Sequence, residues 1–236
     1  MVLFVGLRTT DEDYKQTVSP YPEFQGYRMN NKKAQAGANQ GIAIIGVNID
    51  ELNKKSGEYR EFVILEEFCH LLDDQGDSKP KEKEFWDFVG EYSKSENDRF
   101  AMKVAHELNS HFNHYNVNKL LMVADFEKWL KYRNAQYGKQ LKQRTKGFYN
   151  KITELYPQKQ CIAIFLAEMV KVISFMRAVE SYINENKATI GRKKKEKLEQ
   201  IVVSTKNTID FLKKYAEQLG LANLEILDLF TQETFT

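Results

Sequence analysis

Residues 1–50 carry their apolar positions in short runs and not at helical spacing. Val2–Leu7 is an apolar run, and residues 42–48 form a second run, rich in β-branched side chains, that ends at Asn48. Both runs predict strands, and the Asn-Ile-Asp after the second predicts passage into a helix. Residues 19–22 and 30–39 have the composition of turns and loops. We therefore expect a small antiparallel sheet here.

Beyond residue 58 the apolar spacing becomes helical. Residues 59–73 predict a helix that ends in a loop containing Gly76, and Ser95 is a good N-cap for a helix that starts at residue 96. That last helix repeats Phe100, Val104, Leu108 and Phe112 at every fourth position. Further helices are predicted at 81–93, 120–130, 148–156, 160–187, 193–219 and 222–230, with Gly191 to Lys195 marking the turn between the two longest.

The order of these elements predicts an α+β protein, with a small N-terminal sheet on a helical core and a C-terminal helical bundle. Residues 131–147 contain six basic residues and no acidic residue. We interpret this segment as a solvated connection between a domain at 1–130 and a helical domain at 148–236.

Composition narrows the class of protein. The 236 residues are 42% hydrophobic and 12% aromatic, with a net charge of +2, which does not by itself indicate a nucleic-acid or membrane partner. The most apolar stretch, residues 161–173, is interrupted by Glu168 and Lys171, so we expect no membrane span. The N-terminal apolar run is too short for a signal peptide.

The two cysteines, Cys69 and Cys161, lie in apolar helical contexts and are expected to be core residues. So few cysteines suit a reducing compartment, and we expect a cytoplasmic location. The sequence contains no P-loop, Rossmann glycine pattern, serine nucleophile elbow or Cys-x-x-Cys motif. NTPases, dinucleotide enzymes, α/β-hydrolases and thiol redox proteins are therefore not indicated.

The candidate chemistry lies in the helix at 59–73. Glu66 and His70 are four residues apart and so share one face of that helix, with Glu67 beside them. A carboxylate and an imidazole on one face can bind the same metal ion.

A second pair, Glu107 and His111, has the same spacing along the apolar stripe of the helix that starts at 96. A buried Glu/His pair is costly unless it is bound or paired, so these two complete a four-residue metal site, with Glu96 as an alternative ligand. We expect His106 and His114 to be surface or supporting residues.

Residues 63–73, after the strand predicted at 42–48, resemble the strand-then-helix core of zincin-type metallopeptidases, most closely the small minigluzincins. Their motif is H-E-x-x-H on an active-site helix, with an acidic third ligand on a second helix. The resemblance covers about residues 41–120. In Glu66-Glu67-Phe68-Cys69-His70 a glutamate replaces the first histidine.

The resemblance implies a metal-dependent hydrolase in which metal-activated water attacks a peptide bond of a peptide or protein substrate. Glu67 matches the general base, Glu66 and His70 match two ligands, and Glu107 or Glu96 matches the acidic ligand. Zinc is the expected ion, with manganese or iron as alternatives because of the carboxylates. An extra anionic ligand makes the metal a poorer Lewis acid, so the activity is expected to be weakened or lost.

Two other hypotheses about the function compete with the hydrolase. In one, the C-terminal helices of a non-catalytic scaffold protein bind a partner or a second copy of the chain. In the other, Glu67-x-x-His70 belongs to a di-iron bundle, but the required second Glu-x-x-His does not occur in the sequence.

Overall fold

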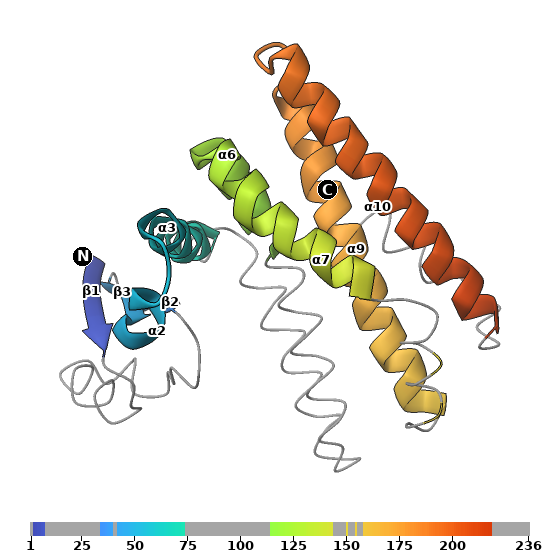
Figure 1. Ribbon diagram of the computed structural model, residues 1–236, viewed down its shortest axis with the longest axis horizontal. Coiled ribbons are helices and arrows are strands. Elements are labelled where there is room, and N and C mark those ends of the chain that lie inside the picture. The colour runs from blue at the N-terminus through green and yellow to red at the C-terminus, as the bar shows by residue number, and fades with distance from the viewer. Residues whose placement is uncertain are drawn as a thin grey trace.

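The computed structural model describes residues 2–7, 34–39, 42–73, 114–143, 150, 154 and 158–218. Most of these residues are helical, which confirms the predicted helical character of the chain. Figure 1 shows the elements in chain order. The helices predicted at 81–93 and 222–230, the first part of the helix predicted from 96, and all but two residues of 148–156 lie outside the described residues.

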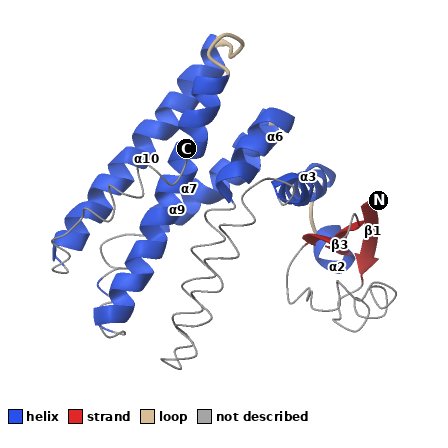
Figure 2. Ribbon diagram, turned by 180° about the vertical axis from the view of Figure 1, so that it is seen from behind, coloured by secondary structure: helices blue, strands red, loops and turns tan. Residues whose placement is uncertain are grey.

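Three short strands, β1 (Val2–Leu7), β2 (Ala34–Asn39) and β3 (Ile42–Asn48), pair in the order β1-β3-β2. They lie beside α2 and α3, at the opposite end of the described structure from α10 (Figure 2). β3 pairs in parallel with β1 and antiparallel with β2. The pairing is mixed, so the expectation of purely antiparallel strands is wrong.

β2 lies in a segment that we expected to be loop. Its sequence, Ala-Gln-Ala-Gly-Ala-Asn, contains no β-branched or aromatic residue and has little strand propensity of its own. Its neighbour β3 is the apolar central strand, with Ile44 and Ile45 buried, and the two are joined by a short connection. Pairing with β3 therefore overrides the local propensity of β2.

Two helices follow β3 as the sequence predicts. Asn48 caps α2 (Ile49–Asn53), because its side-chain oxygen accepts the backbone N–H of Glu51 at 3.1 Å. α3 (Gly57–Asp73) begins after Ser56 and corresponds to the helix predicted at 59–73. α3 packs on β2 and β3, with Leu71 in a small cluster with Ala43 and Ile45.

The next described stretch is helical in four parts. Residues 114–124 form a helix that breaks at Asp125, whose carboxylate caps α6 (Phe126–Lys128) by accepting the backbone N–H of Lys128 at 3.0 Å. A π-helix, η2 (Trp129–Asn134), and then α7 (Ala135–Gln143) follow without a break.

Residues 131–143, which belong to the segment that we interpreted as a connection, are helical. Their missing acidic partners lie on another helix: Lys131 pairs with Glu58 of α3, and Arg133 pairs with Glu66 of α3. Composition within one segment cannot reveal partners that lie some seventy residues away.

α9 (Gln158–Glu185) and α10 (Arg192–Gln218) form the long helical hairpin that the sequence predicts, joined by a turn at residues 186–191. Within the described ranges, no helix combines the length and the apolar character needed to cross a membrane.

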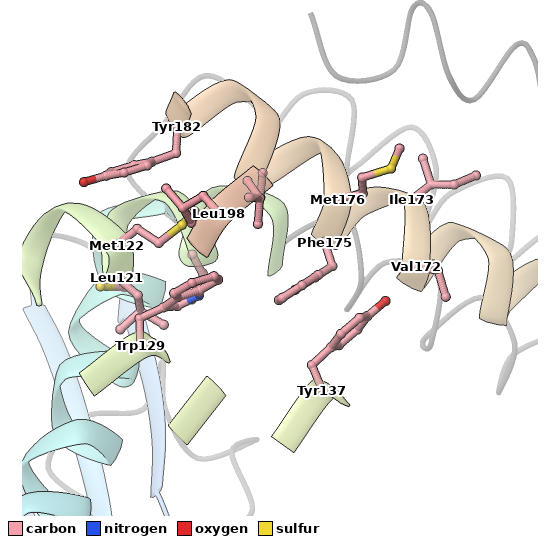
Figure 3. Close-up of a cluster of buried hydrophobic side chains, with 14 of the residues drawn as sticks. Leu121, Met122, Trp129, Tyr137, Val172, Ile173, Phe175, Met176, Tyr182 and Leu198 are labelled. Atoms are coloured by element: carbon pink, nitrogen blue, oxygen red, sulfur yellow. The ribbon is translucent and has the colours of Figure 1, made fainter. Parts of the chain in front are cut away.

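One hydrophobic core joins the N-terminal elements to these helices (Figure 3). Trp129 is fully buried and stacks with Phe126 and with Phe175, whose ring centroids lie 5.8 and 6.0 Å away. Phe62 of α3 and Leu198 of α10 belong to the same core. Side chains thus pack across the boundary that we expected near residue 131.

A polar side chain, Asn118, lies within the core. The buried side chain of Asn118 accepts the indole N–H of Trp129 at 3.0 Å and donates to the backbone carbonyl of His114 at 2.6 Å. Both polar ends of the amide are therefore satisfied, and the first helical turn at His114 is tied to the central tryptophan.

We predict that Asn118→Ala lowers the free energy of unfolding by about 1–3 kcal/mol, because it leaves the buried indole N–H without an acceptor. Urea denaturation measures this loss. Asn184→Ala, at an exposed position of α9, is the matched control and is expected to change stability by less than about 0.5 kcal/mol. Equal losses in the two variants would contradict the structural role of Asn118.

Candidate metal centre

Three potential ligands meet where α3 faces the helix at 114–124. Glu66 and His70, one turn apart on α3, lie next to His114 at the start of the second helix. One ligand atom from each residue lies within 4.8 Å of those of the other two. The imidazole rings of His70 and His114 meet edge to face, with centroids 5.2 Å apart. All three residues are half-buried, so the cluster is sheltered but not sealed.

A cationic side chain of η2, that of Arg133, forms an ion pair with one member of the triad. The Arg133 Nη1 atom lies 2.8 Å from Glu66 Oε1, and these side chains are only 16% and 18% exposed. This ion pair engages one oxygen of the carboxylate, and a carboxylate has a second oxygen that can bind a metal. Ligand carboxylates in metal sites commonly have such hydrogen-bonding partners.

A cavity of about 200 Å³ adjoins the triad. It lies between residues 114–140 and α9, and two of its lining residues, His114 and Arg133, also belong to the triad or contact it. The other lining residues are Asn118, Gln136, Tyr137, Gln140, Lys171, Ser174 and Phe175. One residue of the triad, His114, therefore lines a space that can hold a small molecule.

The structure brings together two of the predicted ligands, Glu66 and His70. The predicted general base, Glu67, lies half-buried on α3 next to Glu66. The predicted ligands Glu107 and His111, and the alternative Glu96, lie outside the described residues.

His114, which we expected at the surface or in a supporting role, is instead the third member of the cluster. One signal in the sequence indicates this position. His114 precedes Val117 by three residues and Leu121 by seven, and both are fully buried. That spacing places His114 on the buried face of its helix.

The donor set fits a zinc ion. Two imidazoles and one carboxylate are the protein ligands of several catalytic zinc sites, which keep a fourth position open. Bonds of about 2.0–2.1 Å around a tetrahedral ion place ligand atoms roughly 3.3 Å apart. The ligand atoms here lie within 4.8 Å of one another, and side-chain movements of about an ångström bring them to the separation that zinc requires.

Cys69, one residue before His70, belongs to the hydrophobic core and not to the triad. Burial, together with the nearby carboxylate of Glu66, raises the pKa of the Cys69 thiol to about 12. Without a metal the thiol therefore stays protonated at neutral pH, and a protonated thiol is not a nucleophile. Both cysteines are buried and neither forms a disulfide, which confirms their expected place in the core.

No protein-family model, curated protein or solved structure matches this chain. A function is therefore inferred from the chemistry of the residues themselves.

The Cys69 pKa predicts a pH dependence of stability. Since the folded-state pKa of about 12 exceeds the ordinary value of 9.0, the protonated thiol contributes its full stabilisation below pH 9 and loses it between pH 9 and 12. We expect the difference in unfolding free energy between wild type and Cys69→Ala to shrink over that range. Denaturation at several pH values tests this, and a constant difference would contradict the assignment.

Proposed function

We propose that the protein is a metal-dependent hydrolase of the metallopeptidase type, with zinc as the first choice of ion and a peptide or protein as substrate. The observation that carries the proposal is the meeting of Glu66 and His70 with His114 beside a cavity. A zincin-like arrangement also has an active-site helix beside a small sheet and a further ligand from a second helix. A histidine in place of the expected acidic ligand restores the common His₂Glu set.

In this proposal Glu66, His70 and His114 hold the ion, which supplies Lewis acidity and activates water near neutral pH. Glu67 follows the first ligand directly, as the glutamate of H-E-x-x-H does, and serves as the general base. Arg133 holds the Glu66 carboxylate and partly neutralises it. A less negative ligand set makes the ion a stronger Lewis acid. This offsets the loss of Lewis acidity that we expected because Glu66 stands in place of the first histidine of the motif.

Two observations favour the alternative, a non-catalytic scaffold. The ion pair with Arg133 satisfies Glu66 without any metal, as a purely structural role requires. α10 also exposes Val203 and Phe211, apolar side chains suited to a partner or to a second copy of the chain. The two proposals differ in one measurable property, which is specific metal binding.

We expect purified wild-type protein to contain close to one equivalent of zinc, manganese or iron by elemental mass spectrometry. The metal should be lost in His70→Ala and in His114→Ala, because each removes one of three ligands. His111→Ala is the matched control. If His111→Ala keeps its metal, the third ligand is His114, as the structure indicates. If His111→Ala loses its metal and His114→Ala keeps it, the third ligand is His111, as the sequence predicted. Wild-type protein that neither contains nor takes up metal would contradict the hydrolase.

A second variant separates metal binding from catalysis. Glu67→Gln keeps the size of the side chain but removes the base, so we expect full metal content and a hydrolysis rate about 10²–10⁴-fold lower. A mixed peptide library followed by mass spectrometry gives the rate. Unchanged hydrolysis in Glu67→Gln would exclude Glu67 as the general base.

A further inference from the structure

A second cavity, of about 370 Å³, lies between the helical stretch of η2 and α7 and the hairpin of α9 and α10. Apolar side chains, those of Leu130, Phe175 and Ile201 among them, form one part of its lining. The volume falls within the roughly 300–1,000 Å³ that is typical of small-molecule sites. No residue of the triad belongs to this lining, so the cavity is a site distinct from the candidate metal centre.

The apolar wall of this cavity is fixed in place. Tyr137 and Phe175 stack with ring centroids 3.8 Å apart and planes 14° apart (Figure 3). The Tyr137 hydroxyl also donates to the backbone carbonyl of Lys171 in α9, at 3.2 Å. A preformed wall of this kind can receive a ligand without the cost of ordering its side chains.

Gly138 leaves room in the cavity. It lies inside α7, where glycine destabilises a helix relative to alanine. A Cβ atom at this position would meet no atom of another element within 4 Å, so no close approach of the described residues requires a glycine here. The absent side chain therefore has one visible consequence, which is open space beside the apolar wall.

The lining contains one charged residue, the exposed Lys197, and none of its described members is acidic. Within the described ranges, the ion pairs of α10 that involve a cation use Arg192, Lys195 and Lys206. Lys197 has no anionic partner in that part of the chain. A single ammonium group beside an apolar wall is complementary to a singly charged anion with an apolar body.

A second hydrogen-bond donor comes from the other side of the cavity. Asn134, at the end of η2, is half-buried, and its side-chain amide has no hydrogen-bond partner among the described residues. The amide nitrogen of such a side chain carries two N–H donors, which suit a carboxylate oxygen. Donors from η2 and from α10 thus line the same space.

We propose that this cavity binds a small monocarboxylate with an apolar body. The carboxylate accepts hydrogen bonds from Lys197 and Asn134, and the apolar body lies along the aromatic wall in the space that Gly138 leaves open. One cation matches one negative charge, so a carboxylate fits better than a doubly charged phosphate group. The proposal concerns a site apart from the metal centre and does not rest on the proposed function.

The test is a calorimetric titration of the full chain with hydrocinnamate and with hydrocinnamamide, which share a phenyl ring and a short chain and differ only in the carboxylate. We expect the carboxylate to bind about ten-fold more tightly than the amide, as one charge-assisted hydrogen bond provides. Lys197→Met should remove this preference, and Lys197→Arg should keep it. Lys214→Met, at another exposed lysine of α10, is the matched control and should not affect it.

A second pair of variants tests the cavity itself. Gly138→Leu places a side chain in the open space and should abolish binding of both compounds, whereas the smaller Gly138→Ala should keep the preference for the carboxylate. Thermal melting checks that each variant folds, and the Lys197 variants decide the matter alone if Gly138→Leu does not fold.

Three results overturn the proposal: wild type that binds neither compound or binds both equally, a preference for the carboxylate that persists in Lys197→Met, and a folded Gly138→Leu variant that binds hydrocinnamate as wild type does. Because the titration needs no metal, its outcome is independent of the metal measurement.

Discussion

The contact between α3 and η2 is the constraint on which the candidate site depends. Tyr132 of η2 packs against Tyr59 and Phe62 of α3, with ring centroids 5.2 and 5.3 Å away. On either side of this aromatic contact, Lys131 pairs with Glu58 and Arg133 pairs with Glu66. Glu58, Phe62 and Glu66 are four residues apart and form one stripe of α3, and His70 continues that stripe into the triad. The same packing that joins the two helices thus sets the position of both α3 ligands.

The π-helical geometry of η2 suits this contact. Figure 1 looks nearly down the axis of α3, while residues 126–143 run across the view, so the two helices cross steeply. At such a crossing, three consecutive residues of η2 contact three turns of α3. A π-helix is wider than an α-helix and is found often at functional sites. Trp129, at the start of η2, is buried in the central core, which anchors this less favourable helix.

Much of the fold follows from local sequence patterns. The spacing of apolar residues predicted α3, α9 and α10, and the β-branched run predicted β3, because long amphipathic or strongly apolar segments carry their own signal. β2 and the helix at 131–143 were not predicted, because their own sequences carry no such signal. β2 depends on pairing with β3, and the basic helix depends on the acids of α3.

The candidate site likewise contains two residues that the sequence predicts as ligands and one that it does not. Glu66 and His70 are predictable from their spacing on a single helix. His114 belongs to a different helix, and its approach to α3 is set by tertiary packing through Asn118 and Trp129. Spacing along the chain shows which residues share a face, but it does not show which faces meet.

The most direct test of this account is the zinc-edge X-ray absorption spectrum of the protein loaded with one equivalent of zinc. The triad predicts only nitrogen and oxygen ligands at about 2.0–2.1 Å, including two imidazoles, with one imidazole missing in His114→Ala. A sulfur ligand at about 2.3 Å, or an unchanged imidazole count in His114→Ala, would contradict the triad of Glu66, His70 and His114.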